Sequence, residues 1–102
     1  MYIVQKLIYN KKSITKVSVE WECERPYQTI ESAMNYVKSY LGYINKVDTH
    51  KNAKGEFMAI MNENGELEMA YYLYEGIVDR INVYDIESLE QFIVDMNEYR
   101  ID

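Results

Sequence analysis

Apolar residues recur along the chain with two spacings, every second residue in some segments and every three or four residues in others. The first segments of the chain predict a hairpin. Residues 2–9 carry apolar side chains at both odd and even positions, that is, at both parities. This pattern is typical of a strand covered on both faces or placed inside an interface. Residues 10–13 are polar and predict a turn. From Thr15 to Glu24, apolar and polar residues alternate, with three glutamates on the polar side. These two runs predict an N-terminal β-hairpin.

A helix follows the second strand. Pro26 cannot donate to a strand ladder and ends that strand, and Thr29 is a favourable N-cap. The apolar positions after it recur every three or four residues: Ile30, Ala33, Met34, Val37, Leu41 and Ile44. The helix ends at Gly42 as a C-cap or continues to about Asn45.

The middle of the chain predicts an exposed loop over 48–55 and then a second hairpin. Strands at 56–61 and 67–74 flank the turn sequence Asn62-Glu63-Asn64-Gly65. A two-residue turn would place Met69 opposite Ile60. A three-residue loop with a left-handed Gly65 instead aligns one apolar set: Phe57, Ala59 and Met61 with Leu67, Met69, Tyr71 and Leu73. We favour the second register because it gathers more apolar side chains on one face.

The last elements are a strand at 77–84, after Gly76, and a closing helix capped by Asp85. The apolar positions of this helix are Ile86, Leu89, Phe92, Ile93, Met96 and Tyr99. We therefore expect a single α+β domain over 1–102, in the order strand, strand, helix, three strands, helix. The simplest architecture is an antiparallel sheet of about five strands with both helices packed on one face.

Composition narrows the class of protein. The chain has 102 residues, is 48% hydrophobic, and contains no apolar run of the roughly 18 residues that span a bilayer. Its start lacks a signal-peptide pattern, and its single cysteine cannot form an intrachain disulfide, so we expect a cytoplasmic protein. Abundant Tyr, Ile, Lys and Asn with few Ala and Gly are typical of AT-rich coding, which suggests a bacterium, a phage or a mobile element as the source.

Few residues suit catalysis or cofactor binding. His50 is the only histidine and lies in the predicted loop, and Cys23 lies on the apolar side of its strand beside Trp21, where it would act as a small hydrophobe. The residues around His50 alternate like the opening of a calcium loop, but Ala53 occupies the position that needs glycine. We expect no metal and no cofactor, and no enzymatic activity unless carboxylates alone supply it.

Charge is strongly segregated. The net charge of the chain is −6, yet residues 56–102 hold twelve acids against two arginines, a net charge of −10. An acidic half of this kind argues against direct nucleic-acid binding. Lysines 11, 12 and 16 with lysines 46, 51 and 54 would form a basic patch only if the first turn and the 48–55 loop lay close together.

Eleven tyrosines are the most unusual feature of the composition. Tyrosine suits partly wet interfaces because it joins an apolar ring to a polar hydroxyl. If Tyr71 and Leu73 face the core, then Tyr72 and Tyr74 point outward with Glu66 and Glu68. The alternative is that the tyrosines fill a core poor in other aromatic residues.

We therefore expect a small acidic, non-enzymatic binding protein, such as an inhibitor or immunity-type protein that imitates the charge of DNA and engages a basic, nucleic-acid-binding protein. The expected partner-binding residues are Glu20, Glu22, Glu24, Glu66, Glu68, Tyr72 and Tyr74. The alternative is a small-molecule or nucleotide binder with a tyrosine-lined groove and a lysine or Arg80 for phosphates. A homodimer through the strand at 2–9 is compatible with either function.

Overall fold

A computed structural model describes residues 1–14, 16–50 and 55–98. Within these ranges the elements are β1 (Tyr2–Lys11), β2 (Val17–Tyr27), α1 (Ile30–Val47), β3 (Glu56–Asn62), β4 (Leu67–Tyr74), β5 (Ile77–Ile81) and α2 (Ile86–Glu98). Five strands form one antiparallel sheet, which confirms the predicted fold class and element order. Neither of the two described helices is long and apolar enough to cross a membrane.

The strand order is β2-β1-β3-β4-β5, so β1 is an inner strand and β2 and β5 are the two edges. β1 pairs with β2 on one side and with β3 on the other. Its apolar residues at both parities are therefore explained by coverage on both faces of the sheet. A second copy of the chain cannot pair with β1, because both of its hydrogen-bonding edges are occupied.

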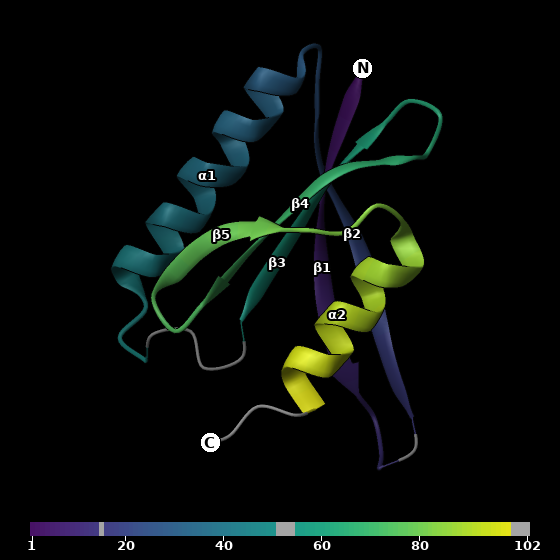
Figure 1. Cartoon of the computed structure of the whole chain (residues 1–102). Helices are drawn as coiled ribbons and strands as arrows, with labels where there is room; N and C mark the ends of the chain where they lie inside the picture. Colours follow the sequence, from purple (N-terminus) through teal and green to yellow (C-terminus); the bar gives the residue numbers. More distant parts are fainter. Residues whose placement is uncertain (15, 51–54, 99–102) are drawn as a thin grey trace.

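The helices lie on opposite faces of the sheet (Figure 1), where we expected them on one face. α1 packs through Ala33, Val37 and Leu41 against one face, and α2 packs through Leu89 and Ile93 against the other. β3 shows why: all five residues from Phe57 to Met61 are buried, with alternate side chains directed to the two helices. A strand that is apolar at both parities needs a cover on each side.

The β3–β4 hairpin also differs from the favoured register. Ile60 pairs with Met69, as the two-residue turn would have it, while Met61 pairs with Leu67 across a β-bulge. Gly65 does adopt the left-handed conformation, with φ of 78°. The bulge changes the phase of β4, so Leu67 joins the α2 side whereas Met69, Tyr71 and Leu73 join the α1 side.

The predicted helix starts are confirmed. The Thr29 hydroxyl accepts a hydrogen bond from the Ser32 N–H at 3.2 Å, and the Asp85 carboxylate accepts one from the Ser88 N–H at 2.7 Å. α1 continues through Gly42 to Val47, so its end lies beyond either predicted position, and β5 ends at Ile81, before the predicted Tyr84. Of the predicted positions, Thr15 and Tyr99 lie outside the described residues.

Candidate functional site

The seven predicted partner-binding residues lie in two separate parts of the sheet. Glu20, Glu22 and Glu24 are on the edge strand β2, whereas the other four are on β4 or its preceding turn, with β1 and β3 between the two groups. The seven residues therefore do not form one continuous surface. Each place has its own geometry.

The row of glutamates on β2 is largely solvated. Glu20 and Glu22 are exposed, and Glu20 accepts a hydrogen bond from the Asn10 amide at 2.8 Å. In the register with β1, Glu20 lies opposite Ile8 and Glu22 opposite Lys6. Glu24 is half-buried and has no partner in the β1 register, because the register shifts at this point. The alternation predicted from the sequence thus holds up to this bulge.

The second group of carboxylates is organised by one asparagine at the β3–β4 turn. The Asn62 side-chain amide donates to both Glu66 and Glu68, each at 3.1 Å. Its oxygen accepts from the backbone N–H of Asn64 at 2.9 Å and of Glu66 at 3.0 Å. These contacts hold the exposed Glu66 and Glu68 side by side at the end of the hairpin.

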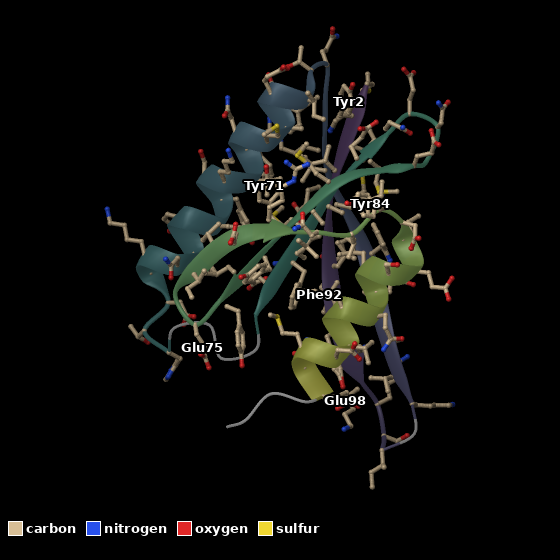
Figure 2. All side chains as sticks on the ribbon, in the orientation of Figure 1. Tyr2, Tyr71, Glu75, Tyr84, Phe92 and Glu98 are labelled. Carbon is tan, nitrogen blue, oxygen red and sulfur yellow. The ribbon has the colours of Figure 1, made fainter. Side chains whose placement is uncertain are left out.

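Tyr72 does not point into solvent as predicted. It is half-buried, and its ring lies 6.1 Å from that of Phe92 on α2, at an interplanar angle of 51°. The prediction was wrong because it assumed that only one face of the sheet is covered, whereas α2 covers the face that carries Tyr72. Figure 2 shows Phe92 between α2 and the sheet. Tyr74 is half-buried opposite Ile77, whose side chain is largely exposed.

Two long-range pairs that the sequence did not reveal attach α2 to the first hairpin. The Trp21 indole N–H donates to Glu90 at 2.7 Å, and the Lys11 ammonium donates to Glu98 at 3.0 Å. Hydrogen bonds from Lys11 and Tyr9 lower the pKa of Glu98. Two of the acids on α2 are thus committed to internal contacts, and no local pattern could have found them because their partners are 69 and 87 residues away.

On the other face, cations and tyrosines interleave where the start of α1 meets β2. Arg25 lies 5.6 Å from the ring centres of both Tyr27 and Tyr36. The Lys6 ammonium donates to the Tyr40 hydroxyl at 3.2 Å and lies 3.7 Å from Glu56. Burial lowers the pKa of Lys6, but the bond to Tyr40 and the charge of Glu56 outweigh it and leave this pKa raised. These tyrosines serve packing inside the chain.

A cavity of about 350 Å³ lies between α1 and β5. Lys38 and Arg80 line it together with Asp79, above an apolar floor that includes Tyr71. Lys38 and Arg80 are exposed, and neither forms an ion pair within the described residues. Arg80, which we expected to serve phosphates in the alternative function, thus has a second cation and a tyrosine beside it.

A larger open cavity, of about 1090 Å³, lies where β1 meets the C-terminal ends of both helices. Its lining includes Lys6, Lys11 and His50, but both lysines are held by Glu56 and Glu98. These ion pairs offset the positive charge that an anionic ligand would need. Lys51 and Lys54 of the predicted basic patch lie outside the described residues.

The single cysteine and histidine are both exposed. We expected Cys23 on an apolar face, but it lies opposite Gln5 next to the bulge, beyond the part of β2 that packs under α2. The His50 backbone N–H donates to the Asp48 carboxylate at 3.0 Å. In residues 1–14, 16–50 and 55–98, no group of three or more histidines, cysteines or acids is placed to hold a metal ion.

Comparison with protein-family models, with curated proteins and with solved structures found no match to this chain.

Proposed function

We propose that this chain is a non-enzymatic, acidic binding protein of the cytoplasm that engages a basic protein, in the manner of an inhibitor or immunity-type protein. The observation that carries the proposal is a surplus of exposed carboxylates. Glu20, Glu22, Glu66 and Glu68 are all exposed, and none forms an ion pair within the described part of the chain. α2 adds the exposed Glu87 and Asp95 and carries no lysine or arginine.

Such carboxylates are available to a partner without breaking internal ion pairs. A nucleic-acid-binding protein carries a basic surface that is complementary to phosphates. Ordered rows of glutamates present the same negative charge as phosphates to that surface. The association is then fast at low salt and weakens as salt screens the charges. Direct binding of nucleic acid does not fit this surface, since phosphates and carboxylates repel each other.

The test is affinity capture of basic proteins from cells of the source organism, at low and at high salt. We compare the wild type with two double variants, Glu20→Lys/Glu22→Lys and Glu66→Lys/Glu68→Lys, which change the net charge equally. We expect a salt-sensitive basic partner for the wild type and its loss in at least one variant that remains folded by circular dichroism. Retention of the partner by both variants, or no capture at low salt, would contradict the proposal.

The cavity between α1 and β5 supports a second candidate function, the binding of a small phosphate-bearing molecule or nucleotide. Lys38 and Arg80, two cations that form no ion pair with the described residues, line a cavity within the usual size range of ligand sites. A ligand that binds the native state raises the melting temperature. We expect a nucleotide to do so for the wild type and not for Arg80→Ala; a nucleotide screen that leaves the melting temperature unchanged contradicts this candidate.

A further inference from the structure

The edge of the sheet at β2 has the geometry of a strand-docking site. β2 is eleven residues long and, among the residues that the structure describes, pairs only with β1. In an antiparallel pair, alternate residues turn their N–H and C=O groups away from the partner strand. About half of the backbone groups of β2 are therefore directed toward the open edge, where a further strand can bind to them.

The regular part of this edge is the segment 17–23. Its register with β1 has no break, whereas Glu24 lies at the bulge and Pro26 follows it. A bulge and a proline both prevent a further strand from pairing, because one disturbs the ladder and the other lacks an N–H. The docking segment therefore ends where the bulge begins.

The two sides of this segment differ in chemistry. Ser18, Glu20 and Glu22 are exposed and lie on the face of the sheet that also carries α1. Val19 and Trp21 lie on the other face, half-buried beside α2, where Glu90 accepts the hydrogen bond from the indole N–H. The segment is thus acidic on one side and apolar on the other.

We propose that the segment 17–23 of β2 binds an extended segment of the basic partner as a sixth strand. This inference rests on the proposed function and specifies how the partner binds. Residues of the added strand that lie opposite Glu20 and Glu22 are lysine or arginine, because opposite charges stabilise cross-strand pairs. The residues between them are apolar and extend the layer formed by Val19, Trp21 and α2.

The same charges disfavour a second copy of this chain as the occupant. A two-fold antiparallel pairing of β2 with another β2 brings the glutamates of both copies onto one face and opposite one another. Like charges in directly opposed positions destabilise a pair of strands. The row of glutamates therefore selects against self-association and in favour of a cationic strand.

The experiment uses a capped peptide of about nine residues in which lysine alternates with threonine or valine, long enough to pair with the segment. Trp21 is the only tryptophan of the chain and lies within the docking segment, so its fluorescence reports binding directly. We expect saturable binding to the full-length wild type. We expect binding at least about tenfold weaker for Glu20→Lys/Glu22→Lys, since two attractive cross-strand pairs become repulsive.

Three controls separate strand pairing from simple attraction. The variant Glu66→Lys/Glu68→Lys changes the net charge equally and should bind the peptide within about twofold of the wild type at physiological salt, where distant charges are screened. A peptide with glutamate in place of lysine should bind Glu20→Lys/Glu22→Lys in preference to the wild type. A lysine peptide with alternate amides N-methylated keeps its charge, loses its ladder donors and should not bind.

Equal binding of the methylated and unmethylated peptides, or equal loss in the two double variants, overturns the strand-docking proposal. So does the absence of binding to the wild type. None of these results bears on the capture of a folded basic protein, so the proposed function and its strand-docking form can fail separately.

Discussion

The glutamates of β2 and those of the β3–β4 turn carry the same charge in different structural settings. Glu66 and Glu68 are both bonded to Asn62 at the end of the β3–β4 hairpin, where the backbone N–H and C=O of Glu66 are also bonded to Asn62. Glu20 and Glu22 lie on an edge strand whose outer backbone groups have no neighbouring strand in the described part of the chain. The turn can attract a basic surface by charge alone, whereas β2 can, in the proposed mode, also pair through its backbone with an extended segment.

The two regions also differ in what holds them. The β3–β4 turn is maintained by local contacts around Asn62, whereas β2 pairs with β1 and also contacts α2 through the Trp21–Glu90 bond, 69 residues away. The proposed docking segment on β2 therefore depends on contacts between distant parts of the chain.

Trp21→Ala should lower the free energy of unfolding by about 2–3 kcal/mol, because it removes a large half-buried ring and leaves Glu90 without its donor. Urea denaturation measures this change. Glu90→Gln keeps an acceptor for the indole and is the matched control, with an expected loss below about 1 kcal/mol. If Trp21→Ala left the free energy of unfolding unchanged, the contact between Trp21 and Glu90 would not stabilise the fold.

Asn62→Ala should cost about 1 kcal/mol, since the backbone N–H groups of Asn64 and Glu66 lose their shared acceptor but remain open to water. The neighbouring Asn64→Ala should change stability by less than about 0.5 kcal/mol, as expected for a surface side chain. Thermal unfolding of the two variants compares them. A larger loss for Asn64→Ala would contradict the central role of Asn62 in the turn.

The smallest effect is the pH dependence that arises where Lys11 meets α2. Hydrogen bonds from Lys11 and Tyr9 lower the pKa of Glu98 in the folded state. The contribution of Glu98 to stability is therefore present above its ordinary pKa of 4.5 and is lost as the pH falls through the lowered folded-state pKa.

Lys11→Met should flatten this part of the stability profile, measured as the urea midpoint between pH 3 and pH 7. Lys12→Met changes the charge equally at an adjacent exposed position and should leave the slope as it is in the wild type. The same slope in all three proteins would show that the Lys11–Glu98 bond does not contribute.

Local patterns predicted the order of the strands and the helix starts, but β2 continues through Pro26 to Tyr27, where we expected the proline to end it. Thr29 and Asp85 cap their helices through bonds to residues three positions away, and the alternation in β2 appears as predicted up to the bulge. These features depend on contacts within a few residues, which the sequence displays directly. The end of α1 was less predictable, because packing over the sheet carries the helix through Gly42.

The sequence contained a pattern that indicates where the helices lie, but we interpreted this pattern wrongly. Residues 2–9 and 57–61 are apolar at both parities, which already indicates strands covered on two faces. Taking this pattern into account would have predicted a helix on each side and an inward position for Tyr72. The register of β3 with β4 was harder to predict, because the bulge after Ile60 changes the face of every later residue on β4.

The sequence by itself determined the α+β class, the order of the elements, the helix caps and the location of the acidic residues along the chain. The tertiary structure alone decided which acids are held by contacts between distant elements and which remain exposed. Glu90 and Glu98 are held by partners from the first hairpin, while Glu20 and Glu22 line an open edge. The physical reason is that strand order and helix packing join residues across most of the chain, and such contacts leave no local pattern in the sequence.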